Sequence, residues 1–328
     1  MRGETMAIEL PPEEILSEGA VGDIARNWPD EPQELRKKSN LRSGEKWAAL
    51  LFLIPALAGF GIFWIGSGVR GLNFAFTDFN LLQDPNHVGL SNFREMINDP
   101  NVWNSLRVTA LFAVVNVLLG TFLSLVTAAL MQRLRLKTWV RSIMLLPWLV
   151  PGVAIALIWG LLLDANVGFI NSILRRLGLP FLSFFNSSQA IWIIIGISVW
   201  SGLGYTALLL YAGMTQVPTD VYEAGAIDGA SESRMFFSIT LPLIRPIIAL
   251  VLVLGVIGSL QVFDLVMIGY GGTPIQAVRV IFFYIFQQAF EFFRMGYASA
   301  VALLLVAIMG ILTLIQMRVM RANESELS

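Results

Sequence analysis

The chain has 328 residues, of which 56% are hydrophobic and 14% charged, and its formal net charge is −1. This composition is unusual for a soluble domain, and the near-zero charge gives no indication of a nucleic-acid partner. Because the chain contains no cysteine, structural disulfides, thiolate catalysis and cysteine-based metal sites are excluded.

The first 45 residues form a polar tail whose charge is divided between two parts. Residues 1–34 hold nine acidic and two basic residues, whereas residues 36–46 are strongly basic. Such a charged segment cannot bury enough apolar surface to fold, so we expect the tail, residues 1–45, to be largely disordered. The first apolar run begins only at Trp47, which argues against a cleavable signal peptide.

Six apolar stretches without Asp, Glu, Lys or Arg follow the tail, the fifth of them stopping at Asp264 and resuming after it. A bilayer core about 30 Å thick needs about 20 helical residues. The stretches predict an all-α membrane protein with six transmembrane helices, at about 47–69, 108–130, 142–163, 190–214, 247–270 and 297–317. One membrane domain, residues 46–320, is expected, followed by a C-terminal tail, residues 321–328.

Lysine and arginine indicate the orientation of these helices. All four lysines lie before the first apolar run or in the short loop between the second and third helices, which also carries three arginines. Because cytoplasmic loops carry an excess of Lys and Arg, this side is expected to be cytoplasmic, with both termini inside.

The loops on the opposite side are expected at residues 70–107, 164–189 and 276–294. The first is rich in turn-forming residues and contains His87, the only histidine, which we interpret as an exposed loop residue and not a metal ligand. Apolar residues recur at helical spacing in the third, which predicts an amphipathic helix at the outer interface or packed over the pore. Within the third transmembrane helix, Pro147 and Pro151 predict a kink.

Residues 215–246, between the fourth and fifth helices, contain an unusually long polar segment. Pro218 and Thr219 can start a short helix that Gly229 ends in a left-handed conformation. Ser231 can cap a second helix, which Pro242 is expected to terminate. Residue chemistry alone leaves two interpretations open, an ordinary interfacial hairpin and a docking surface for another protein.

The order and spacing of three short motifs here resemble the "EAA" loop of permease subunits in binding-protein-dependent ABC importers. The motifs are Glu223-Ala224-Gly225, Asp228-Gly229-Ala230 and Leu241-Pro242-Leu243, with glycine in place of the usual alanine at position 225. Four further motifs resemble the carbohydrate-specific branch of that family, and the resemblance covers about residues 46–320: Leu146-Pro147-Trp148-Leu149-Val150-Pro151, Gly168-Phe169-Ile170-Asn171, Gly271-Gly272-Thr273-Pro274 and Gly296-Tyr297-Ala298-Ser299-Ala300.

The resemblance implies a permease subunit that forms half of a translocation pathway for a sugar, a di- or oligosaccharide, in a bacterial cytoplasmic membrane. It implies three kinds of protein partner: a second, different permease chain, two ATP-binding subunits and an extracytoplasmic solute-binding protein. No phosphate-loop motif occurs in the sequence, so ATP and Mg are expected to be bound by the partner ATPase, and the chain itself is not expected to be an enzyme. The ATPase would dock on the cytoplasmic hairpin at Glu223, Ala224, Gly225, Ala226, Asp228 and Gly229.

Polar and aromatic side chains inside the expected helices are candidates for the solute pathway, because amides, carboxylates and aromatic faces suit sugars. These candidates are Asn116, Trp200, Tyr205, Gln261 and Asp264. Hydrogen bonding between helices would explain each of them equally well. The alternative function is an ion-coupled secondary transporter that uses Asp264. A membrane enzyme has less support, since no paired-carboxylate, Ser/His or metal cluster occurs.

Overall fold

The computed structural model describes residues 43–164, 166–180, 182, 189–269 and 276–324. Over these residues the chain is helical, apart from turns and a single antiparallel bridge between Thr77 and His87. Most of the expected tail and the Gly271-Gly272-Thr273-Pro274 motif lie outside the described residues. The chain divides into two units, residues 1–66 and residues 67–328.

The first apolar span, Leu51–Phe74, is built from three consecutive helical segments. These are α2 (Ser43–Phe60) and the π-helical η3 (Gly61–Gly66) in the first unit, and α3 (Ser67–Phe74) at the start of the second. The expected end at residue 69 is wrong, because the helix continues through Arg70. An arginine at the end of a span can extend its charged group to the interface, so it does not stop the helix.

The expected outer loop, residues 70–107, contains more helix than its turn-forming residues indicate. The helix α4 (Ser91–Asn98) lies within it, and α5 (Pro100–Arg133) begins well before the expected residue 108. The Asp99 carboxylate caps α5 by accepting a hydrogen bond from the backbone N–H of Asn101. Pro100 fits the first turn of a helix, where no N–H donor is needed. The Asp99-Pro100 pair is therefore a helix start and not a turn.

The predicted kink in the third span is confirmed as a complete break. The helices α6 (Thr138–Leu149) and α7 (Gly152–Leu162) are bent by 91° relative to each other. Pro147 stays inside α6, whereas Val150, which precedes Pro151, is extended. A residue before proline is disfavoured in the helical conformation, so Pro151 sets the position of the break. The short helix α8 (Phe169–Arg176) follows α7.

The fourth span and the hairpin follow the expected pattern closely. The helix α9 (Ala190–Met214) has the predicted bounds, and the hairpin consists of α10 (Thr219–Ile227), α11 (Glu232–Met235), η4 (Phe236–Thr240) and α12 (Leu241–Leu243). Gly229 has a φ of +73° and Ser231 caps α11, as predicted. The expected stop at Pro242 holds to within one residue, because the helical backbone of the second arm continues through Pro242 and ends at Leu243.

The last part of the chain differs most from the expected helices. The helices α13 (Arg245–Leu260) and α14 (Asp264–Gly269) are separated by a break at residues 261–263. The expected amphipathic helix over 276–294 is shorter, comprising α15 (Ile281–Phe286) and η5 (Gln287–Glu291). The final helix is α16 (Met295–Glu324).

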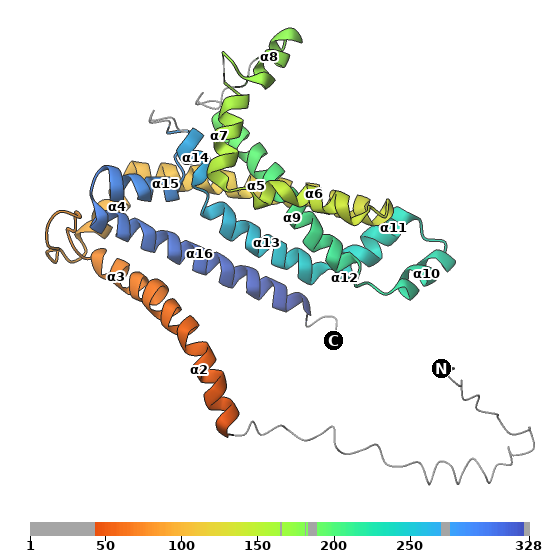
Figure 1. The fold of residues 1–328 in the computed structure, drawn as a ribbon, viewed down its shortest axis with the longest axis horizontal. Helices are drawn as coiled ribbons and strands as arrows, with labels where there is room; N and C mark the ends of the chain where they lie inside the picture. Colours follow the sequence, from red (N-terminus) through yellow and green to blue (C-terminus); the bar gives the residue numbers. More distant parts are fainter. Residues whose placement is uncertain (1–42, 165, 181, 183–188, 270–275, 325–328) are drawn as a thin grey trace, which may run out of the picture. The chain divides into compact units, whose positions relative to one another are not determined.

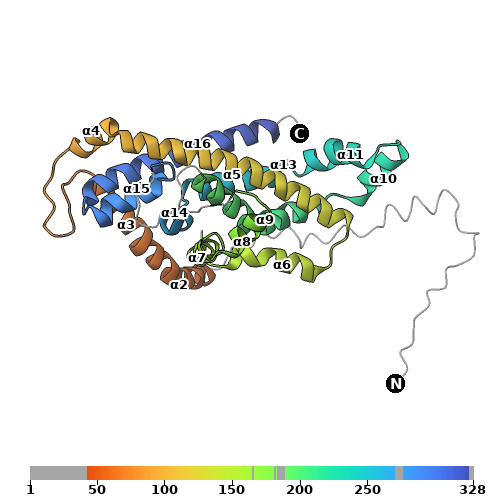
Figure 2. The ribbon, with the colours of Figure 1, turned by 90° about the horizontal axis from the view of Figure 1, so that it is seen from above.

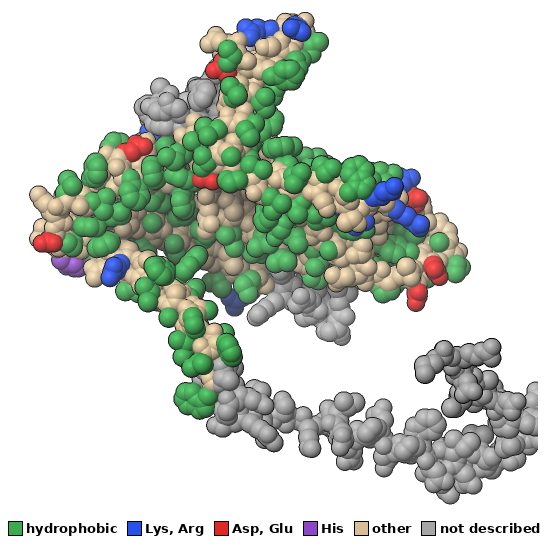
Figure 3. Space-filling model, in the orientation of Figure 1, with side chains coloured by type: hydrophobic (Ala, Val, Ile, Leu, Met, Phe, Trp, Pro, Cys, Tyr) green, Lys and Arg blue, Asp and Glu red, His purple; other side chains and the backbone are tan. Residues whose placement is uncertain are grey.

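Among the described residues, five helical stretches are long and apolar enough to cross a membrane, or six if the bent α6–α7 pair is one span. Four of the long helices of the second unit run side by side, α5, α9, α13 and α16 (Figures 1 and 2). The hairpin α10–α11 lies at one end of this group and α4 and α15 at the other (Figure 1). Charged side chains gather at the hairpin end, while the flank between the ends is largely hydrophobic (Figure 3).

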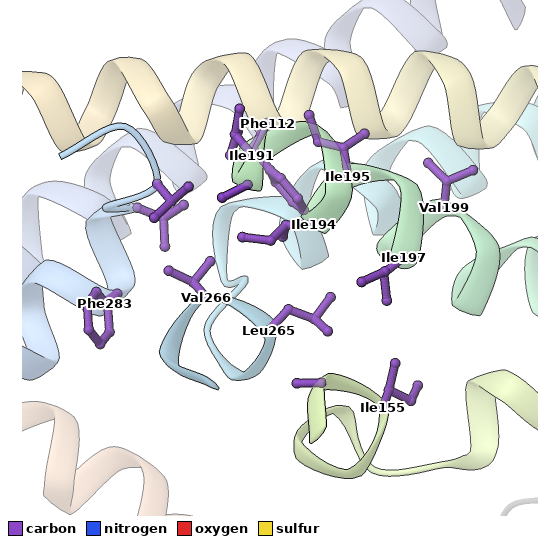
Figure 4. Packing of buried hydrophobic residues seen from close by; sticks show 14 of the residues in the cluster. Phe112, Ile155, Ile191, Ile194, Ile195, Ile197, Val199, Leu265, Val266 and Phe283 are labelled. Carbon is purple, nitrogen blue, oxygen red and sulfur yellow. The ribbon is translucent and has the colours of Figure 1, made fainter. Parts of the chain in front are cut away.

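The core of the second unit forms around α5 and α9. Its largest buried cluster joins α5, α7, α9, α14 and α15, through residues such as Phe112, Ile194 and Val266 (Figure 4). The helices α6 and α9 come so close that a methyl group on Gly204 would lie 1.8 Å from the carbonyl oxygen of Met144. Glycine at position 204 therefore allows direct contact between the two helix backbones.

Candidate functional site

The hairpin presents its predicted docking residues to solvent. Of these six residues, five are exposed and Gly225 is half-buried. The exposed ones are Glu223, Ala224, Ala226, Asp228 and Gly229. Two large apolar side chains of the same hairpin are also exposed, Ile227 to 86% and Phe237 to 65%. Exposed apolar groups with adjacent carboxylates and small residues are suited to contact with another protein.

The two arms of the hairpin are held together by specific contacts. The hydroxyl groups of Tyr222 and Thr240 are hydrogen-bonded at 2.8 Å, which joins α10 to the end of η4. A methyl group on Gly225 would lie 3.0 Å from the terminal carbon of Ile239 and 3.6 Å from Met235. The glycine that departs from the family pattern therefore lets α10 pack closely on the second arm.

Two charged contacts lie beside the hairpin end. The Arg133 guanidinium at the end of α5 is 3.1 Å from the Glu232 carboxylate at the start of α11, but both side chains are exposed, so the pair contributes little to stability. The Arg141 guanidinium of α6 lies 4.7 Å from the centre of the Tyr211 ring of α9. This second contact ties α6 to α9 near the hairpin.

A cavity of about 250 Å³ lies among α5, α6, α9 and α13. Asn116 and Tyr205 line it, as do Trp148 and Ser259, so the structure brings two of the five pathway candidates together. The Trp148 and Tyr205 rings are stacked, with centres 4.3 Å apart and planes inclined by 7°. Trp148 was not predicted to line a cavity, and its place in the Leu146–Pro151 motif is the one signal that marked it in the sequence.

Asn116 joins two helices at the cavity wall. Its amide nitrogen donates a hydrogen bond of 2.9 Å to the Ser259 hydroxyl of α13. Its amide oxygen is buried and has no hydrogen-bond partner among the described residues. The bond joins two helices, as the helix–helix interpretation expects, and the unused acceptor leaves hydrogen-bonding capacity at the wall.

The other three pathway candidates lie outside the cavity. Trp200 packs edge-on against Trp159, with ring centres 5.6 Å apart. The exposed Gln261 amide approaches the Met309 sulfur at 3.9 Å. The Asp264 carboxylate fills the space beside Gly152, where a methyl group would lie 2.5 Å from its oxygen. Gly152 begins α7, so Asp264 lies against a helix start, a position that favours a negative charge.

A polar cluster that the sequence did not reveal lies at the other end of α5. The Asp99 carboxylate accepts hydrogen bonds from the hydroxyl groups of Tyr284 in α15 and Tyr297 in α16, the latter at 2.7 Å. Beside it, the Arg294 guanidinium forms two bonds of 2.7 and 2.6 Å with the Glu95 carboxylate of α4. These contacts join α4, α5, α15 and α16.

The cluster also perturbs the acidity of its members. Partial burial would raise the pKa of Asp99, but the hydrogen bonds from Tyr284, Tyr297 and Asn101 outweigh burial and lower it below its ordinary value. Burial, together with the hydrogen bond to Asp99, raises the pKa of the Tyr284 phenol. The cluster is therefore held by a carboxylate that stays ionised.

Two motifs noted in the sequence have structural roles, one in a close backbone contact and one in closing a loop. Gly296 lets the start of α16 meet the backbone at Thr77, since a methyl group there would lie 2.0 Å from the Thr77 oxygen. The buried Asn171 amide donates to the backbone oxygens of Leu163 and Leu182 and closes the loop after α7. His87 is exposed, and the described residues contain no cluster of three His, Asp or Glu side chains able to hold a metal.

Apolar helices of membrane-spanning length, an interhelical cavity and an exposed hairpin with docking character together define an integral membrane protein of the transporter class. The chain belongs to the family of binding-protein-dependent transport system inner membrane components, whose family model matches residues 120–326. It is therefore a permease subunit of a transport system that depends on a binding protein.

Known proteins resemble the chain over nearly its whole membrane part. It is 34% identical to the probable ABC transporter permease protein YesP of Bacillus subtilis, over 85% of this chain and 92% of that protein. It is 33% identical to the trehalose/maltose transport system permease protein MalF of Thermococcus litoralis, over 83% and 89%. A bacterial ABC transporter involved in the import of the acidic polysaccharide alginate has the same fold, with a TM-score of 0.75, 22% identity and coverage of 85% and 96%.

Proposed function

We propose that this chain is one of two different permease subunits of an ATP-driven importer for a sugar, in a bacterial cytoplasmic membrane. The exposed hairpin α10–α11 carries this proposal, because it lies within the matched family region and offers a surface with no other evident use. Relatives named for maltose, trehalose and alginate support a saccharide, of di- or oligosaccharide size, as the solute. An extracytoplasmic binding protein delivers it, and two partner subunits bind ATP and Mg²⁺.

In the proposed arrangement the α6–α7 pair is one span, so that the membrane domain, residues 46–320, has six. Both termini, with the tails 1–45 and 321–328, and the hairpin then lie in the cytoplasm. The excess of lysine and arginine on this side supports the orientation. Charged side chains at the hairpin end agree with it (Figure 3).

The hairpin is proposed to transmit the movement of the ATPases to the membrane helices. Glu223, Asp228 and the exposed Ile227 supply charge and apolar area, while the small residues around them allow close approach. The bond between Tyr222 and Thr240 makes the two arms move together. Because η4 and α12 lead directly into α13, displacement of the hairpin would tilt a helix that lines the cavity, and switch the pathway between its two states.

Asn116 and Tyr205 are proposed to contact the solute, since both line the cavity. Trp200, Gln261 and Asp264 remain candidates for other parts of the pathway. The ion-coupled alternative is not favoured by any contact of Asp264, whose place beside the start of α7 accounts for its charge. A family that depends on binding proteins also argues against it.

The proposal is tested by mass spectrometry of the proteins that co-purify with the tagged chain from its native membrane. We expect a phosphate-loop ATPase and a second multi-span permease. The Ile227→Asp variant should lose the ATPase and keep the second permease, because it places a charge on the apolar centre of the docking surface. Leu82→Asp, at a side chain exposed to 78% in the outer loop, is the matched control.

Recovery of the chain alone, under conditions that preserve other membrane complexes, would contradict the proposal. Equal recovery of the ATPase with Ile227→Asp and with the wild-type chain would contradict the proposal that the ATPase docks on the hairpin.

A further inference from the structure

The cavity among α5, α6, α9 and α13 has a distinctive chemical lining. Hydroxyl groups predominate among its polar side chains, contributed by three helices: Thr121 and Ser124 of α5, Ser198, Tyr205 and Thr206 of α9, and Ser259 of α13. Each hydroxyl can both donate and accept a hydrogen bond. Asn116 adds an amide whose oxygen has no partner in the described part of the chain.

No charged side chain belongs to this lining. All lining residues fall within the described part of the chain, and none of them is Asp, Glu, Lys or Arg. Moving a carboxylate or phosphate from water into such a site is costly unless a cation pairs with it. Proteins that bind carboxylates and phosphates usually supply arginine or lysine for this purpose. The cavity offers neither.

The remaining wall suits the apolar faces of a sugar ring. The Trp148 and Tyr205 rings, which stack on each other, both line the cavity and add aromatic surface to its wall. Gly202 of α9 also lines the cavity and leaves open space there, because a methyl group on it would meet no atom within 4 Å. Aromatic faces, scattered hydroxyl groups and open volume match a solute that carries many hydroxyl groups on an apolar ring.

Resting on the proposed function, we propose that this cavity selects an uncharged saccharide and excludes anionic sugars such as uronates and sugar phosphates. The alginate importer has the same fold but handles an acidic polysaccharide, so the fold alone does not decide between the two classes. The residues that line the cavity determine the class of solute, and in this chain they suit a neutral disaccharide.

The test measures binding by calorimetry to the complete importer, with both permeases and both ATPases in lipid nanodiscs and without the binding protein. Trehalose, maltose and raffinose are the neutral probes, and sn-glycerol 3-phosphate and a galacturonate trimer are the anionic ones. We expect binding of at least one neutral probe and none of the anionic probes. Omitting the binding protein ensures that selectivity comes from the membrane subunits.

Two variants of the same helix locate the binding. Gly202→Leu fills the cavity and should weaken binding of the neutral probe at least about tenfold, because the added side chain occupies the solute's volume. Gly196→Leu is the matched control, since this exposed glycine also meets no atom within 4 Å but does not line the cavity. It should bind the probe like the wild-type chain.

Three results would overturn the inference: binding of an anionic probe that Gly202→Leu abolishes, binding of neither class, or neutral binding that Gly202→Leu leaves unchanged. The proposed function is judged separately, by uptake of the same saccharides in cells with and without the gene. Loss of uptake of an anionic sugar would keep the importer and reject the neutral class. Unchanged uptake of every saccharide would reject the sugar importer itself.

Discussion

At the scale of single residues, Asp99 holds more elements together than any other side chain of the polar cluster. It caps α5 through the N–H of Asn101 and accepts from Tyr284 and Tyr297, which belong to α15 and α16. Removing its carboxylate would leave two partly buried phenol donors and a helix start without their acceptor. Such losses cost roughly 1–3 kcal/mol when the groups stay buried.

We therefore expect the stability of the folded chain to depend on pH through the ionisation of Asp99. The pKa of the folded carboxyl is lowered from 3.8, so its contribution is fully present above about pH 4 and is lost as the pH falls through the folded pKa. Asp99→Asn should lower the thermal unfolding midpoint in detergent at pH 7, and the difference from wild type should shrink towards pH 3.

An exposed carboxylate of the same loop gives the comparison for this measurement. Asp84→Asn should leave the unfolding midpoint near the wild-type value at both pH values, since its side chain lies in solvent. A difference between wild type and Asp99→Asn that stays constant from pH 7 to pH 3 would show that ionisation of Asp99 is not what stabilises the cluster.

Residue-level prediction succeeded where a local rule decides the conformation. Gly229 at the end of α10 and Ser231 at the start of α11 follow directly from the requirements of a left-handed turn and a helix cap. The partners of Asp99 could not be predicted in this way. Tyr284 and Tyr297 are separated from it by more than 180 residues, and no local pattern marks a contact between them.

At the scale of helices, the contact between α6 and α9 depends on the absence of a side chain. A single methyl group at Gly204 would have to share space with the backbone of Met144, which cannot move aside as a flexible side chain would. Gly204→Ala should therefore separate the two helices and destabilise the folded chain by about 1–3 kcal/mol, the usual range for overpacking.

The same helix provides the control for that prediction. Gly196→Ala places a methyl group where nothing lies within 4 Å, and alanine favours a helix more than glycine does. It should leave the free energy of unfolding unchanged or slightly raised. Equal unfolding free energies for Gly204→Ala and Gly196→Ala, measured by denaturant titration in detergent, would contradict close packing at Gly204.

The spans were predictable because bilayer thickness imposes a minimum apolar length, and α9 agrees with its predicted bounds. The ends of helices that continue beyond the bilayer were not predictable, because a charged residue outside the bilayer does not mark the end of a helix. Arg70 lies inside the first helical span, and α5 starts in a segment that reads as turns. The break at Pro151 was predictable as a kink from its proline, whereas the break at residues 261–263 divides a span that the sequence indicates as one continuous helix.

At the scale of the whole molecule, the number of crossings depends on whether the α6–α7 pair, bent by 91°, crosses the membrane as one span or turns back. If the pair crosses as one span, the loop at Gln83 and the loop after α8 share the outer side, and the hairpin lies opposite. If the pair instead turns back, the hairpin moves to the side of Gln83. The two arrangements agree on the loop at Gln83 and differ in the side on which they place the loop after α8 and the hairpin.

The chain contains no cysteine, so single substitutions report these positions without background. We expect Gln83→Cys and Leu177→Cys to react with a membrane-impermeant maleimide added to intact spheroplasts, and Asp228→Cys to react only after lysis. All three side chains are exposed. Labelling of Asp228→Cys before lysis, together with protection of Leu177→Cys, would establish five crossings and place the hairpin outside. That result would also reject its role as a docking site for a cytoplasmic ATPase, because the topology and the coupling proposal depend on the same crossing.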